Sequence, residues 1–278
     1  MLQVALAGLL AVGFTGPEPG LRVYVPNQMG ASISVLDRSG DPVETVDLVP
    51  LGFSEHAMPH QVAAEPDGSR WYVTLAGDGF VLAFDRDNRL VAKTAVAEPG
   101  MIVLDPGRDL LFVSRAIGAV SPSTSLAVLR APDLELLDEP DVFVPRPHAL
   151  AVDTVSGRVY TGSLSTNGIA NLDFATGAVA VTEVSGPPHA FVGLAASPDG
   201  RLIVATTQLT DMLLAFEAAP DGELLGRAAA NAHAGAGHDM ESPRENGTLA
   251  VIDAPSGTVR SVTEVGPYAA ALGIAPLP

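Results

Sequence analysis

The stretch that decides the fold reads Met58-Pro-His-Gln-Val-Ala-Ala-Glu-Pro-Asp-Gly-Ser-Arg-Trp-Tyr-Val-Thr74. It predicts a strand, a turn at Pro66-Asp67-Gly68 and a second strand, because proline sets the first corner of a turn and glycine accepts positive φ near its end. Related stretches begin at Pro99, Pro147 and Pro188, and a fragment begins at Pro267. The spacing of about 40 residues between them indicates an internal repeat.

A third strand ending in an acidic residue follows in most repeats, as in Leu82–Asp85, and after a short turn comes a more variable fourth strand. Four short strands in each repeat predict an all-β fold, a single β-propeller. A degenerate unit should begin near residue 229, with Thr248–Asp253 and Thr258–Val265 as its third and fourth strands. The repeat count is then six blades, with five or seven as the alternatives.

The two ends of the chain carry complementary strand patterns. Arg22–Asn27 has the pattern of a second strand and Tyr268–Ile274 that of a first strand. Joined, they would form one blade from both termini, which leaves no free sheet edge. We therefore predict one propeller domain over residues 21–278.

The apolar segment Leu2–Phe14 is shorter than the roughly 20 residues that span a bilayer. It matches the central region of a signal peptide, although a basic start is missing. Residues 1–20 are accordingly predicted to be a signal peptide, truncated at its start, with a linker. The protein would then be periplasmic or extracellular, without a membrane span after processing. The alternative is an ordinary core strand.

The composition excludes several classes of function. The formal charge is −17, whereas nucleic-acid binding requires a basic surface. With no cysteine in the chain, disulfides, thiolate metal sites and cysteine nucleophiles are excluded. No serine-hydrolase elbow, P-loop or dinucleotide-binding glycine motif is present in the sequence either.

The recurring Pro-His, Pro-Asp-Gly-Arg and Tyr-Val-Thr motifs resemble the YVTN repeat family of bacterial and archaeal propellers. Val23–Gln28 followed by Ile33–Asp37 is similar to the core of that repeat. The resemblance covers about residues 22–278 and implies the fold. It implies little about function, because relatives include surface-layer proteins, lactonase-like propellers and parts of metalloenzymes.

Histidines gather at the predicted starts of the first strands, where a propeller brings equivalent positions close to its channel mouth. Neutral imidazoles from different strands can bind one transition-metal ion, copper first and zinc second. The alternative is that each histidine caps a turn. The candidate metal ligands are His60, His148, His189, His233 and His238.

A polar rim from the loops between second and third strands would face the same side and bind an anionic or sugar-like ligand. Arg115 stands out because the second strands otherwise carry no charge at this point. The alternative to a ligand-binding role for Arg115 is a salt bridge to a neighbouring blade. The ligand-binding candidates are Arg115, Gln28, Gln208, Ser163 and Tyr268.

Three functions stay open from the sequence. The first is an exported propeller that binds a small molecule, metal ion or protein partner at the top of its channel. The second is a lactonase-like hydrolase with Arg115 holding an anionic substrate. The third is a non-catalytic interaction scaffold on the cell surface. Catalytic residues are not identified, and whether the chain is an enzyme is left open.

Overall fold

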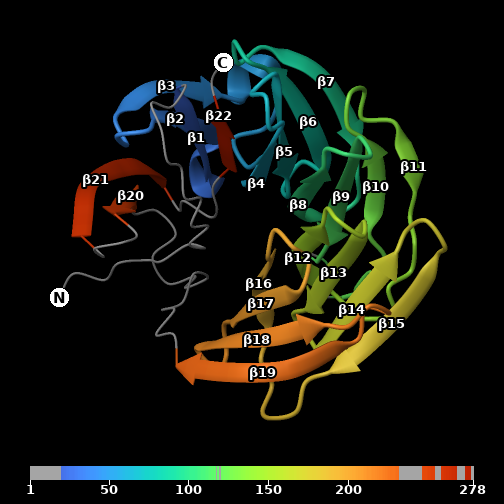
Figure 1. Ribbon diagram of the computed structural model, residues 1–278. Helices are drawn as coiled ribbons and strands as arrows, with labels where there is room; N and C mark the ends of the chain where they lie inside the picture. The colour runs from blue at the N-terminus through green and yellow to red at the C-terminus, as the bar shows by residue number, and fades with distance from the viewer. Residues whose placement is uncertain are drawn as a thin grey trace. The chain divides into compact units, whose positions relative to one another are not determined.

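The computed structural model describes residues 20–116, 118, 120–231, 246–253, 258–267 and 273–276 (Figure 1). The predicted signal segment Leu2–Phe14 and the candidates His233, His238 and Tyr268 lie outside these residues. The chain forms two compact units. Unit 1 comprises Met1–Ala95 with Gly237–Pro278, and unit 2 comprises Val96–Ala236.

Unit 1 contains two four-stranded antiparallel sheets and a two-stranded sheet among its described residues. Two short 3₁₀ turns, η1 and η2, interrupt it at Gln28–Gly30 and Val49–Leu51. In sheet order the strands are β22 (Gly273–Pro276), β1 (Leu21–Asn27), β2 (Ser32–Asp37) and β3 (Pro42–Asp47); β4 (Pro59–Ala64), β5 (Arg70–Leu75), β6 (Phe80–Asp85) and β7 (Leu90–Ala95); β20 (Asn246–Asp253) and β21 (Thr258–Pro267).

Unit 2 contains three four-stranded antiparallel sheets among its described residues. Each uses four consecutive strands, so each repeat pairs with itself. They are β8 (Pro99–Asp105), β9 (Leu110–Arg115), β10 (Ala127–Arg130) and β11 (Leu136–Asp138); β12 (Pro147–Asp153), β13 (Arg158–Ser163), β14 (Gly168–Asp173) and β15 (Ala178–Glu183); β16 (Phe191–Ala196), β17 (Leu202–Thr207), β18 (Met212–Ala218) and β19 (Leu224–Asn231).

Both ends of the chain enter one sheet, as the strand patterns predict. β22 pairs antiparallel with β1, with Val23 opposite Ile274, and the two strands lie side by side in Figure 1. The degenerate repeat supplies β20 and β21 as an antiparallel pair, while residues 232–245 before it lie outside the described part. Repeated four-stranded antiparallel sheets make the fold class a β-propeller; the number of blades stays a prediction.

The acidic residue that ends several third strands has a structural role in the turn after it. Asp37 Oδ1 accepts hydrogen bonds from the backbone N–H groups of Ser39 and Asp41, at 2.8 and 3.0 Å. Asp85 does the same for Asp87 and Arg89, at 2.9 Å each. A carboxylate that bonds its own backbone two residues on fixes a tight turn, which explains why the repeat carries an acid there.

The inner strands of each unit are buried over consecutive residues, as in β5 and β13, where every residue after the first is buried. In unit 1, Trp71 stacks between Tyr24 and Phe84, with ring centroids 4.7 and 4.2 Å apart. In unit 2, Tyr160 and Phe191 are buried in a cluster shared by β12–β15 and β16–β19. Over the described residues, no helix is long and apolar enough to cross a membrane.

Candidate ligand-binding site

The pairing of each first strand with its second strand shows which residues are equivalent between repeats. The first pair of each sheet contains a proline of the first strand in three sheets and Phe191 in the fourth. A register shift follows this first pair in all four sheets. The residue that comes next is therefore His60 in β4, Gly100 in β8, His148 in β12 and Val192 in β16. The pairs are Pro59 with Leu75, Pro99 with Arg115, Pro147 with Ser163 and Phe191 with Thr207.

A hydroxyl on the second strand supports the bulge in two of these sheets. Thr74 Oγ1 accepts the N–H of Gln61 at 3.2 Å, and Ser114 Oγ accepts the N–H of Met101 at 2.7 Å. A β-bulge breaks the ladder and re-aims side chains, so the hydroxyl takes a backbone donor that the bulge displaces. A Cβ at Gly100 would lie 2.7 Å from Ser114 Oγ, so glycine avoids a close contact with this hydroxyl.

His60 and His148 occupy the same position in two sheets, and both are buried, at 4% and 2% exposure. His60 belongs to unit 1 and His148 to unit 2. A buried imidazole at a bulge has a fixed direction, which suits either a packing role or a ligand role. His56, by contrast, lies in an exposed turn before β4.

His189 is not at the equivalent position, which corrects the alignment based on Pro-His. It lies before the start of β16, where the backbone N–H groups of Gln208 and Leu209 bond the carbonyls of Ala190 and His189, at 3.0 Å each. The repeat from Pro188 to its Pro-Asp-Gly turn is longer than the repeat from Pro59. The extra residues place His189 in a loop.

The His189 ring is buried and anchored at one nitrogen. Its Nδ1 lies 2.9 Å from Thr210 Oγ1, which lies 2.8 Å from Thr207 Oγ1. Thr207 also donates to the carbonyl of Met212 at 3.2 Å. The Nε2 atom is 3.4 Å from the Ser185 carbonyl, which is long for a hydrogen bond of this kind.

Arg115 is occupied within its own sheet. Its Nε donates to the Ala97 carbonyl at 3.1 Å, and one terminal nitrogen donates to Ser125 Oγ and Glu139 Oε1, at 3.1 and 2.6 Å. Ala97 precedes β8, Ser125 precedes β10 and Glu139 follows β11. The guanidinium therefore holds the strand ends of a single sheet together, rather than bridging to a neighbouring blade.

Ser163 and Gln208 lie in the same unit. The Ser163 hydroxyl donates to the Pro145 carbonyl at 2.5 Å and accepts the N–H groups of Ser165 and Thr166, at 3.0 Å each. It thus fixes a turn. Gln208 is half-buried in the β17–β18 loop.

Gln28, in η1 of unit 1, is 7% exposed, and its Oε1 accepts no hydrogen bond from a described residue. The neighbouring Asn27 bonds Ser32 and Ser34 through its amide nitrogen, at 3.1 and 3.0 Å. Gln28 stays a ligand-binding candidate from the sequence.

Across the described residues, no group of three or more His, Asp or Glu side chains could hold a metal ion. The Asn167 amide oxygen accepts the N–H of His189 at 2.9 Å, and Thr210 orients the His189 ring. Sequence reasoning misses Thr210, because polar residues are common in the loops between second and third strands and this one carries no distinct signal.

Solved structures similar to this chain are β-propeller proteins, and the likeness shows the fold alone. No family model and no curated protein matches the chain. Kuenenia stuttgartiensis hydrazine synthase is 16% identical with a TM-score of 0.60, covering 79% of this chain and 69% of that one. The Swd1 propeller domain of Myceliophteria thermophila is 9% identical with a TM-score of 0.57, covering 80% and 74%.

A third structure, a protein named as a 6-phosphogluconolactonase from Bacteroides fragilis, is 16% identical with a TM-score of 0.56. The match covers 74% of this chain and 66% of that one. Proteins with such different names share the architecture, so the function of this chain has to be argued from its own side chains.

Proposed function

We propose that this chain is an exported β-propeller of YVTN type that binds a small ligand near the starts of its first strands. We further propose that the ligand is a transition-metal ion, copper ahead of zinc, held in unit 2 by His148 and His189. The observation that carries this proposal is the hydrogen bonding of the His189 ring.

That hydrogen bonding holds the His189 ring by one nitrogen. Nδ1 bonds Thr210 Oγ1, which bonds Thr207 Oγ1, and Thr207 in turn bonds the Met212 carbonyl. In this proposal the hydroxyl chain takes the proton on Nδ1, and Nε2, 3.4 Å from the Ser185 carbonyl, is the atom that binds the metal. An imidazole whose other nitrogen is oriented by a hydrogen bond is the usual form of a metal ligand.

His148 supplies the second imidazole in this proposal. It lies on β12, which packs against the β16 sheet in the shared cluster that contains Ala149 and Phe191. Imidazole nitrogens suit copper and zinc. Gly186 leaves space beside the His189 ring, since a Cβ there would lie 3.3 Å from Nε2. His60, His233 and His238 remain predicted ligands from the sequence.

The test uses untagged protein dialysed against a chelator, with Cu²⁺ or Zn²⁺ added back. A ligand that binds the native state at about 100 times its Kd stabilises it by about 2.7 kcal/mol, so the melting temperature should rise. His189→Asn keeps a donor near Thr210 and removes Nε2, and His148→Ala removes the second ring. Each should abolish the rise.

His56→Asn is the matched control, because His56 is exposed, and it should keep the full rise. If neither metal raises the melting temperature of the native protein, the metal proposal is wrong. An equal rise in native protein and both variants would place the metal elsewhere.

The lactonase-like alternative rests on the likeness to the Bacteroides fragilis structure. Its proposed substrate anchor, Arg115, already binds Glu139 at 2.6 Å, which weakens this candidate. Hydrolysis of a sugar lactone that falls in Arg115→Ala and His148→Ala would favour it over metal binding. Absence of both activities would leave the interaction scaffold.

A further inference from the structure

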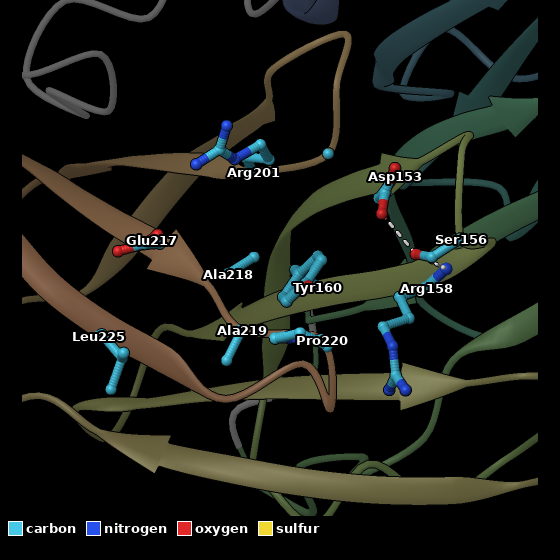
Figure 2. Close-up of a pocket in the computed structure, with 11 residues that line it drawn as sticks. Asp153, Ser156, Arg158, Tyr160, Arg201, Glu217, Ala218, Ala219, Pro220 and Leu225 are labelled. Atoms are coloured by element: carbon cyan, nitrogen blue, oxygen red, sulfur yellow. Dashed lines mark hydrogen bonds between the residues drawn. The ribbon is translucent and has the colours of Figure 1, made fainter.

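A cavity lies within unit 2, at the ends of these strands opposite to His148 and His189. It has a volume of about 480 Å³ and is formed by the turns and strand ends of the β12–β15 and β16–β19 sheets (Figure 2). Cavities of this size accommodate small organic molecules. None of the metal-site candidates lines it, so it is separate from the proposed metal site.

The tyrosine at the centre of this cavity lacks the partner that its equivalent has. Tyr72 in β5 and Tyr160 in β13 occupy the same position of the repeat. The Tyr72 hydroxyl donates to Glu65 Oε1 at 2.8 Å. Tyr160 is only 1% exposed and lines the cavity, yet its hydroxyl bonds no described residue.

The reason for the difference is the acid that faces each tyrosine. Asp153 stands where the other sheet has Glu65 and is one methylene shorter. Its carboxylate holds the turn after β12, because Oδ1 accepts the N–H of Val155 at 2.9 Å and Oδ2 accepts the Ser156 hydroxyl. Figure 2 draws the bond between Asp153 and Ser156. The shorter acid of this sheet thus bonds its own turn, whereas Glu65 bonds the tyrosine hydroxyl.

Two donors of the cavity have no acceptor among the described residues that would hold them. The Tyr160 hydroxyl bonds no described residue, and Arg201 makes no ion pair with one. Arg158 is partly used by Asn171 Oδ1 at 3.2 Å and Asp173 at 3.5 Å, and the Glu217 carboxylate forms an ion pair with Arg227. A ligand that pairs with Tyr160 and Arg201 must supply acceptors.

The positions of the two arginines suggest how a ligand would lie. In Figure 2 the guanidinium groups of Arg201 and Arg158 point away from each other, with Tyr160 between them. Ala218, Pro220 and Leu225 give the lining an apolar part. Such a lining with a few polar groups is typical of small-molecule sites.

We propose that this cavity binds a small organic carboxylate, whose carboxylate pairs with the Arg201 guanidinium, whose further oxygen accepts a hydrogen bond from the Tyr160 hydroxyl, and whose apolar body packs on Ala218, Pro220 and Leu225. Arginine suits a planar carboxylate because its donors match the two oxygens. The tyrosine stays a donor near neutral pH: burial, followed by the charge of Asp153, raises the pKa of Tyr160, and the charge of Arg158 opposes this only in part.

The test screens a panel of small carboxylates against the full-length protein by ligand-observed NMR, each paired with its neutral amide. Carboxylates should bind and their amides should bind at least tenfold more weakly. Tyr160→Phe removes only the hydroxyl, and Arg201→Gln removes the charge. A hydrogen bond to a charged group is worth about 1.5–3 kcal/mol, so each variant should weaken binding by roughly tenfold or more.

Matched controls separate the site from general effects. Tyr72→Phe removes the equivalent hydroxyl in unit 1, and Arg89→Gln removes an exposed arginine of the β6–β7 turn; both should leave carboxylate binding unchanged. The proposal is overturned if no carboxylate binds, if amides bind as well as their acids, or if binding survives in both Tyr160→Phe and Arg201→Gln. None of these outcomes depends on metal, so the two proposals fail independently.

Discussion

Replacing Arg115 by alanine distinguishes a structural arginine from a ligand-binding one. The side chain is 18% exposed and bonds Ala97, Ser125 and Glu139, which flank different strands of one sheet. Each hydrogen bond is worth about 1 kcal/mol net, while the ion pair adds little because the Glu139 side chain is 47% exposed and solvent screens it. The expected loss of unfolding free energy is about 2 kcal/mol.

Urea denaturation followed by circular dichroism measures this loss, and a loss of that size would lower the melting temperature by roughly 4 °C. Glu139→Gln should cost about 0.5 kcal/mol, since an acceptor remains and only the screened charge is removed. Arg89→Ala is the control, because its side chain is 72% exposed and should contribute almost nothing. If Arg115→Ala stays within about 0.5 kcal/mol of the native protein, the strand-holding role is wrong and the guanidinium is available for a ligand.

Three further changes test the packing and ionisation of the fold. Gly200→Ala should cost at least about 1–2 kcal/mol in a denaturation experiment, because φ is +69° and a Cβ would lie 2.6 Å from Asp153 Cγ; an unchanged midpoint would contradict this. Trp71, the one tryptophan of the chain, stacks on Phe84 with ring centroids 4.2 Å apart. Phe84→Leu should therefore lower the unfolding free energy by about 1–2 kcal/mol and alter the fluorescence emission of Trp71. Phe174→Leu in unit 2 is the control and should leave the emission unchanged. Burial raises the pKa of Tyr24 from 10.0 to about 12, so the folded state holds this proton more tightly than the unfolded state does. Stability should therefore be full below pH 10 and fall by about 2–3 kcal/mol as pH rises towards 12; Tyr24→Phe should flatten that fall, and an unchanged slope would refute the cause.

The fold could be predicted because the same turn and strand-end motifs recur several times along the chain. The Pro66-Asp67-Gly68 turn and the acid at Asp85 are each sufficient to end a strand, and both recur at similar spacing. The pairing of β22 with β1 also follows from two incomplete patterns at the ends of the chain. These are local signals, and the structure confirms them.

The candidate site could be predicted only in part, since side-chain partners depend on residues far away in the sequence. His148 is at the predicted position, but His189 is displaced by the longer stretch before its turn. The sequence drew attention to the charge of Arg115, yet Glu139, 24 positions away, takes that charge up. A motif identifies the residue type, whereas strand register decides what it contacts.

Because side-chain contacts depend on distant residues, a repeat can form a distinct site without any new sequence motif. Tyr72 and Tyr160 look alike in the sequence, and both fill the core of their sheets. Exchanging one acid for a shorter one, Glu65 for Asp153, leaves the second hydroxyl without its intramolecular acceptor. The tyrosine ring still packs in the core, while its hydroxyl bonds no described residue in a cavity that Tyr160 lines. Differences between equivalent residues, rather than the shared pattern, are therefore where a repeat protein of this kind carries its specificity.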